Sequence, residues 1–181
     1  MRRPLDQYHT NEYLTRTLLK HTDIYGSILE PCAGKGHISS ILKELPNAQV
    51  IENDIDPSMG FAYVDDATIM CAKIWGRQYD WVVTNPPFNK AFSILEKSWA
   101  FTTVGVAMLL RLSFLEPTIK RSTWLSRHAP QLSNLIIFGT PRPSFTDDGY
   151  TDTVTAAWFV WQHGYFGKTQ VSFETRKKTV L

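Results

Sequence analysis

The segment that most constrains the fold is residues 27–46, where an apolar strand leads through a glycine turn into a helix. Residues 27–29 read as a strand, and the sequence Ala-Gly-Lys-Gly follows at residues 33–36. Apolar residues then recur at helical spacing over 38–42 until Pro46 ends the pattern. Strand, glycine turn and helix in this order form the first unit of a doubly wound sheet, so the sequence predicts an α/β protein.

The rest of the chain continues the alternation of strand and helix. Residues 11–21 predict a short leading helix and residues 91–100 predict another. Further strands are expected at 48–52, 61–64 (the weakest), 79–84, 104–110, 134–138 and 155–161. The strand over 104–110 is wholly apolar, as a central parallel strand should be. Residues 176–178 are expected to be frayed.

Length and composition predict one domain over residues 1–181, with 1–22 as a leading segment. The 181 residues are 43% hydrophobic, and neither a repeat nor a linker divides them. No apolar run approaches the roughly 20 residues that span a bilayer, so a soluble, cytoplasmic protein without membrane contact is expected. Cys32 and Cys71 are expected to be free thiols, and the sequence shows no spacing for a metal site. The net charge of +2 neither supports nor excludes a nucleic-acid partner.

Polar residues and glycines stand where the predicted strands end. Gly34 and Gly36 allow a close approach of the backbone to a ligand, or form an ordinary turn. Asp54 lies where an acidic side chain accepts hydrogen bonds from a ribose, and Asp66 ends the next segment; either is alternatively a turn or capping aspartate. The third glycine of a dinucleotide fingerprint is replaced by Ser39, and the order of a phosphate-binding loop is absent. These strand ends predict a ligand crevice.

The sequence Asn85-Pro86-Pro87-Phe88 directly follows the predicted strand over 79–84. Two consecutive prolines rigidly set the exit of the chain, and thereby hold the Asn85 amide in one place. An exocyclic amino group is a poor nucleophile because its lone pair is delocalised, and two fixed acceptors for its N–H bonds favour the more nucleophilic form. The Asn85 amide oxygen and the Pro86 carbonyl are suitable acceptors. Phe88 stacks on a base or, alternatively, packs in the core.

These motifs resemble those of the class I S-adenosylmethionine-dependent methyltransferases, in particular the amino-methyltransferases with Asn-Pro-Pro-Phe. The resemblance implies a Rossmann-like, seven-stranded, mostly parallel sheet with a C-terminal antiparallel hairpin. It also implies S-adenosylmethionine as cofactor, and assigns catalysis to Asn85, Pro86, Pro87 and Phe88. The residues implied in cofactor binding are Tyr8, Thr10, Glu30, Pro31, Ala33, Gly34, Gly36, Asp54, Ile55, Asp66, Ala67 and Asn85.

Residues 106–116, 142–149 and 157–161 are similar to small adenine-specific methyltransferases of phages and prophages. In that family the loop between the last two strands approaches the substrate base. The likeness implies substrate contacts by Phe88, Arg111, Arg142 and Phe145. The alternatives are that Phe145 packs under the loop and that the arginines pair with nearby aspartates.

The expected function is therefore methylation of the N6 amino group of adenine in DNA, in a phage or mobile-element setting. Adenine in RNA, a glutamine amide in protein, and a non-catalytic binding module of the same fold are the alternatives. No segment has the length of a target-recognition domain, and only residues 113–133, with Lys120, Arg121, Arg127 and His128, are placed to contact nucleic acid beyond the base. Shallow sequence specificity, a flipped or single-stranded base, and a homodimer or recognition partner are expected.

A covalent role for Cys32 is not expected. The Pro31-Cys32 pair resembles the nucleophile of cytosine C5 methyltransferases, but it lies in the glycine loop rather than after the fourth predicted strand.

Overall fold

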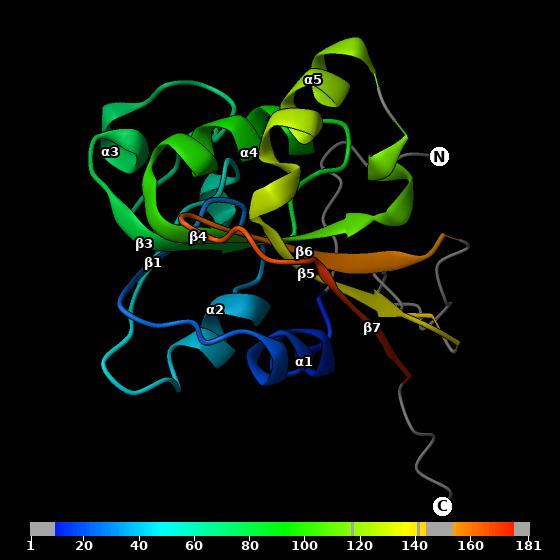
Figure 1. The fold of residues 1–181 in the computed structure, drawn as a ribbon. Helices are drawn as coiled ribbons and strands as arrows, with labels where there is room; N and C mark the ends of the chain where they lie inside the picture. The colour runs from blue at the N-terminus through cyan, green and yellow to red at the C-terminus, as the bar shows by residue number, and fades with distance from the viewer. Residues whose placement is uncertain (1–9, 117, 141, 144–153, 176–181) are drawn as a thin grey trace, which may run out of the picture.

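A computed structural model describes residues 10–116, 118–140, 142–143 and 154–175. In this part of the chain a seven-stranded sheet lies between two layers of helices (Figure 1). The order of strands is β2-β1-β3-β4-β6-β5-β7, and only β6 runs against the others. The strands are β1 (Ser27–Glu30), β2 (Gln49–Glu52), β3 (Tyr79–Thr84), β4 (Thr102–Arg111), β5 (Leu132–Phe138), β6 (Ala156–Gln162) and β7 (Gln170–Glu174).

Helices cover both faces of the sheet, and each face has its own apolar core. The helices α1 (Glu12–His21) and α2 (His37–Leu42) lie on one face (Figure 1). The other face carries α3 (Ala72–Trp75), α4 (Ala91–Ala100) and α5 (Ile119–His128). Short 3-10 turns cover Pro57–Met59, Leu112–Leu115 and Ala129–Gln131. None of the described helices is long and apolar enough to cross a membrane.

The core explains why the middle parts of the central strands are apolar: residues 81–83 of β3 and 106–110 of β4 are all buried. Trp81 and Trp158 are fully buried toward α1 and α2, while Trp161 is buried toward α4 and α5. The indole N–H of Trp158 donates to the carbonyl of Leu14 in α1 at 2.8 Å, so this buried donor is satisfied. Strands buried on both faces have no polar alternation, as expected for the middle of a doubly wound sheet.

The α/β prediction and the antiparallel pair are confirmed. The last two predicted strands form β5 and β6, which pair antiparallel, and β6 also pairs antiparallel with β4. The helix predicted over 91–100 is α4, and the leading helix is α1.

One predicted strand is wrong. Residues 61–64 form only an isolated bridge, between Tyr63 and Asn53. The following residue, Asp65, hydrogen bonds through its backbone to the Asn53 side chain rather than to a neighbouring strand. The seventh strand is instead β7, which the sequence analysis did not predict and which pairs parallel with β5.

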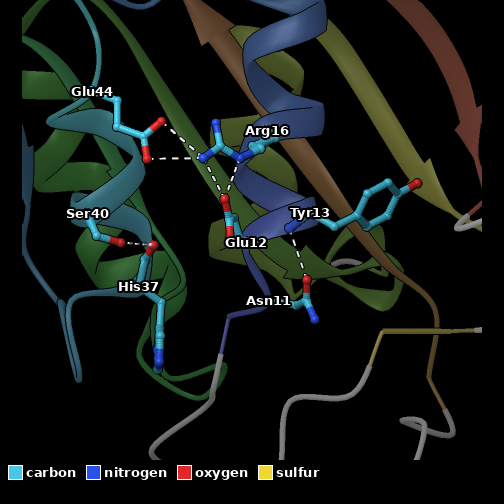
Figure 2. Close-up of polar contacts among 7 residues, drawn as sticks. All are labelled: Asn11, Glu12, Tyr13, Arg16, His37, Ser40 and Glu44. Carbon is cyan, nitrogen blue, oxygen red and sulfur yellow. Dashed lines mark hydrogen bonds and ion pairs between the residues drawn. The ribbon is translucent and has the colours of Figure 1, made fainter.

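Polar contacts join the surfaces of α1 and α2 and cap the start of α1 (Figure 2). The Asn11 side chain caps α1 by accepting the backbone N–H of Tyr13 at 3.0 Å. The Arg16 guanidinium contacts Glu12 within α1 and, at 3.0 Å, Glu44 just beyond α2. This cap fixes the backbone at Asn11, directly after Thr10.

Candidate active site

Four parallel strands end at the same edge of the sheet, and the residues after them form the candidate site. Parallel pairing of β2, β1, β3 and β4 places their carboxyl ends side by side. Ligands of open α/β sheets bind beyond such ends, because the loops there diverge. The predicted glycine turn, acidic residues and Asn-Pro-Pro-Phe sequence all lie at this edge.

The glycine loop after β1 is a tight turn with open space beside it. The N–H of Gly36 donates to the carbonyl of Ala33 at 2.8 Å. Gly34 and Gly36 have φ values of +53° and +76°, which side chains rarely adopt. A Cβ added at Gly34 would meet no heavy atom within 4 Å, so this backbone faces open space. The predicted loop residues Pro31 and Ala33 are buried beneath the turn.

The loops after β1 and β2 are tied to each other. The N–H of Gly34 donates to Asp54 Oδ2 at 2.7 Å, while Asp54 Oδ1 accepts the N–H of Asp56 at 3.0 Å. Asp54 is half-buried, and Ile55 beside it is exposed. The carboxylate of Asp54 is thus held at the glycine loop, within reach of solvent.

The sequence analysis missed Asn53, which joins three loops of the site. Its buried side-chain amide donates to the carbonyls of Pro31 and Asp65, both at 2.9 Å, and accepts the N–H of Asp65 at 3.0 Å. Its backbone also bonds to Glu30 and Ala33. In the sequence Asn53 reads only as a polar residue ending a strand, because its partners are 12 and 22 residues away.

Asp66 and Ala67 lie at the third loop. The Asp66 carboxylate accepts the backbone N–H of Thr68 at 2.8 Å and its hydroxyl at 2.7 Å. These hydrogen bonds, chiefly that from the Thr68 hydroxyl, lower the pKa of Asp66. Ala67 is buried. Asp66 is therefore a turn-capping aspartate, as the structural alternative expected, and it remains partly exposed at the site edge.

Glu30, the last residue of β1, is a buried carboxyl group. Burial raises its pKa well above the usual range; hydrogen bonds from Ser39 oppose the rise, and the nearby carboxylates of Glu52 and Asp54 add to it. Its Oε2 atom has no hydrogen-bond partner among the described residues. A buried acceptor without a donor is costly, and a cationic or donor group of a ligand would relieve that cost.

Asn85 is held by its amide nitrogen while its amide oxygen stays available. It lies directly after β3 and is 8% exposed. Its Nδ2 donates to the hydroxyl oxygen of Thr10 at 3.1 Å, and Thr10 is itself only 3% exposed. Within the described part of the chain, Asn85 Oδ1 accepts no hydrogen bond. The geometry therefore leaves an acceptor fixed at the edge of the sheet, where it can accept a hydrogen bond from an N–H donor.

Pro86 and Pro87 set the exit from β3, and Phe88 follows them with its ring partly exposed. Pro86 is buried, and the carbonyl of Pro87 accepts the N–H of Lys90 at 2.9 Å just before α4. The guanidinium of Arg111, the last residue of β4, lies over the Phe88 ring at 4.4 Å from its centroid. Phe88 and Arg111 thus come together at the site, and Phe88 is not a core residue.

The remaining predicted substrate contacts are not brought together with Asn85 by any described interaction. Arg142 is exposed, and Phe145 lies outside the described residues, as does Tyr8, which was predicted to bind the cofactor. The expected roles of all three stay predictions. On α5, Lys120 pairs with Glu96 at 2.6 Å, and Arg121 lies over the Phe114 ring and donates to the Glu116 carbonyl. These two basic residues have partners inside the chain.

Cys32 lies in the glycine loop as a half-buried thiol. Burial, and then the nearby Asp54 carboxylate, raise its pKa far above that of a free cysteine. The thiolate is the nucleophilic form of cysteine, so this environment suppresses reactivity. Among the described residues no group of histidines, cysteines and carboxylates could hold a metal ion.

Comparison by structure finds known proteins where comparison by sequence does not. No protein-family model and no curated protein matches the sequence. A type I restriction-modification methyltransferase subunit from Streptococcus thermophilus matches with a TM-score of 0.66 at 12% identity over 93% of this chain. This chain spans only 47% of that subunit, about half its length.

Two further solved structures share the fold. A dimethyladenosine transferase from Plasmodium falciparum matches with a TM-score of 0.59 at 16% identity, over 84% of this chain and 62% of its own. A predicted O-methyltransferase from Agrobacterium tumefaciens matches with a TM-score of 0.58 at 15% identity, over 92% and 86%. The chain therefore has the Rossmann-like fold of the class I methyltransferases, as the resemblance implied.

Proposed function

We propose that the chain is an S-adenosylmethionine-dependent methyltransferase that methylates the N6 amino group of adenine in DNA. The observation that carries this proposal is Asn85: a buried side chain whose amide nitrogen is bonded to Thr10 while its amide oxygen has no described partner. The shared fold of the neighbours supports a methyltransferase. The acceptor is inferred from Asn85 and its surroundings.

The loops at the carboxyl edge fit the cofactor. S-adenosylmethionine supplies an activated methyl group when bound. The open space at Gly34 leaves room for its methionine part, and Glu30 Oε2, which has no hydrogen-bond partner among the described residues, would accept from its ammonium group. The Asp54 carboxylate, half-buried at the glycine loop, suits the ribose hydroxyls. Asn53 holds these loops in one arrangement before any ligand binds.

The residues after β3 would prepare the substrate. Asn85 Oδ1 and the carbonyl of Pro86 would accept the two N–H bonds of an amino group, which localises the nitrogen lone pair toward the methyl donor. Phe88 would stack on the flat base, contributing about 1–3 kcal/mol. Arg111, already over the Phe88 ring, would add positive charge beside the base. An aromatic wall favours a planar base over a protein amide.

The test is transfer of labelled methyl from S-adenosylmethionine to duplex DNA, single-stranded DNA, RNA and total protein in parallel, with hydrolysis of each product. N6-methyladenine in DNA is the expected product, and the preferred strand state reports whether the base must be flipped from a duplex. Label in RNA or in glutamine instead would replace DNA adenine as the substrate. Cofactor binding without transfer to any of them would reject the proposed chemistry.

Two variants make the test specific to the Asn85 amide. Asn85→Ala is expected to reduce kcat by about 10²–10³-fold, the usual effect of removing one fixed hydrogen-bonding group from a transition state. Asn47→Gly is the matched control: Asn47 is exposed, lies in the turn before β2, and has a φ of +62° that glycine adopts without strain. Equal kcat values for the two variants would show that the Asn85 amide has no part in catalysis.

A further inference from the structure

The two edge strands of the sheet, β2 and β7, differ in what lies beside them. At the β2 edge, Tyr63 forms a bridge with Asn53 and covers the carboxyl end of the strand. At the β7 edge, no described segment pairs with the outer side of the strand. An uncovered strand presents a row of backbone donors and acceptors to solvent.

The backbone groups that face outward on β7 can be identified from its pairing with β5. The N–H of Gly139 donates to the carbonyl of Glu174 at 2.8 Å. In a parallel pair the residues of a strand alternate between bonding to their neighbour and facing away from it. Gln170, Ser172 and Glu174 therefore bond to β5, so Val171 and Phe173 direct their N–H and C=O groups away from the sheet.

The same two residues carry exposed apolar side chains. Val171 lies beside Leu135, and Phe173 beside Ile137, on the sheet face that carries α5. Val171 is 53% exposed and Phe173 is 75% exposed. Natural edge strands are usually protected by lysine, proline or a bulge, and residues 170–174 contain no lysine, arginine or proline. In the part of the chain that the structure describes, the β7 edge is therefore open to another strand.

We propose that β7 pairs antiparallel with β7 of a second copy of this chain, about a two-fold axis that passes beside Ser172. In this register each Val171 lies opposite Phe173 of the other copy, and both are outward-facing residues. Each such pair exchanges two backbone hydrogen bonds, so the outward N–H and C=O groups of both strands are satisfied. The apolar side chains of the two copies cover each other on one face of the joined sheet.

The polar face of the strand is also complementary to itself in this register. Glu174 lies opposite Gln170 of the second copy, so no like charges oppose each other. Lys168 of the second copy lies on the diagonal from Glu174, within reach of a long side chain. Because the strand matches its own reverse in side chains, charge and backbone groups, a second copy suits this edge better than an unrelated strand.

The first experiment is sedimentation equilibrium of the full chain over a range of concentrations. The wild-type chain is expected to form a concentration-dependent dimer. Phe173→Lys should reduce the association constant at least about tenfold, because it places a charge in the paired face. Phe166→Lys is the control, since Phe166 is 77% exposed but precedes β7. A chain that is monomeric throughout, or a dimer equally affected by both variants, would overturn the proposal.

The second experiment tests the register. In the proposed pairing the two Ser172 residues form a non-hydrogen-bonded pair with Cα atoms about 4.5 Å apart. That spacing suits a disulfide, so Ser172→Cys should give a covalent dimer on mild oxidation. Peptide mapping separates this bond from any formed by the native Cys32 or Cys71. A Phe166→Cys variant that cross-links as readily, or no bond between the two introduced cysteines, would reject the register.

Discussion

Strands β1 and β3 carry polar residues at both ends, but these residues are hydrogen-bonded at the amino ends and partly unpaired at the carboxyl ends. At the amino ends, the N–H and hydroxyl of Ser27 donate to Asp80 Oδ2 at 2.8 and 2.9 Å, and the Thr103 hydroxyl donates to Asp80 Oδ1 at 3.1 Å. At the carboxyl ends, Glu30 Oε2 and Asn85 Oδ1 have no partner among the described residues. Each unmade buried bond costs about 1–3 kcal/mol. The hydrogen bonds at the amino ends thus stabilise the sheet, whereas the carboxyl ends keep two buried acceptors unpaired among the described residues.

The largest effect on stability is expected at the amino end. Asp80→Asn should reduce the free energy of unfolding by about 2 kcal/mol, a modest value because Asp80 is partly exposed. Hydrogen bonds, first of all from the Ser27 backbone, lower the pKa of Asp80 below its ordinary 3.8. The stabilisation is therefore present above that pH and is lost as the pH falls through the lowered pKa.

Urea unfolding of the wild type and Asp80→Asn from neutral to acidic pH measures this difference. The gap between the two proteins should close with acidification, because the wild-type carboxyl group then becomes neutral. A gap that is independent of pH would show that the charge of Asp80 does not stabilise the amino end. Methyl transfer per folded molecule should be unchanged, since Asp80 lies near the amino end of β3 and Asn85 follows its carboxyl end.

At the carboxyl end a smaller change should affect mainly activity, with a loss of stability of about 1 kcal/mol because the buried Asn85 amide N–H loses its acceptor. Thr10→Val removes the acceptor for Asn85 Nδ2 and lets the amide rotate, so kcat should fall about tenfold, or about 1.4 kcal/mol. Thr10→Ser keeps the hydroxyl and should restore most of the activity. Steady-state kinetics and calorimetric titration of S-adenosylmethionine separate the effects. A loss confined to cofactor affinity would show that Thr10 contacts the cofactor rather than positions Asn85.

Glu30→Gln should stabilise the fold by about 1 kcal/mol at neutral pH, raising Tm by about 2–4 °C. Burial raises the pKa of Glu30, so the folded state disfavours its charged form. Wild-type stability should fall as the pH rises above the ordinary value of 4.5, and the advantage of the variant should grow in the same direction. Calorimetry at several pH values measures this. A destabilised variant would mean that the Glu30 carboxyl group stabilises the carboxyl end of the sheet, as Asp80 stabilises the amino end.

The smallest effect is expected away from both strand ends. Arg16→Ala removes the exposed contacts with Glu12 and Glu44 shown in Figure 2, and should leave Tm unchanged within error. Thermal melting at low and high salt checks this. A clear loss at low salt would show that the anchoring of α1 on α2 matters to the fold.

Much of the fold could be predicted because its strands are buried on both faces. The apolar run in β4 and the glycine turn at 33–36 have local sequence signatures. The predicted strand at 61–64 was wrong. The backbone N–H and C=O of the next residue, Asp65, bond to the Asn53 side chain, so they do not extend the pairing of Tyr63 along a neighbouring strand. β7 was missed because Val171 and Phe173 are exposed, and its short sequence lacks the pattern of a buried strand.

The candidate site could be predicted only where a local motif exists. The glycine loop, Asp54 and the residues after β3 lie at one edge, as expected. The link between Thr10 and Asn85 joins residues 75 apart, and the contact between Phe88 and Arg111 joins the ends of two strands. Neither contact has a spacing that a sequence reveals, because each arises from the assembled sheet.

The amide of Asn53 has a thermodynamic consequence for ligand capture. A site made of separate loops loses conformational entropy when a ligand orders them, and that loss subtracts from affinity. Here one side chain bonds to Pro31 and Asp65 beyond its own strand, so the relative placement of the three loops is set during folding. For the proposed cofactor site, the ordering cost would thereby fall on the folding step rather than on the binding step.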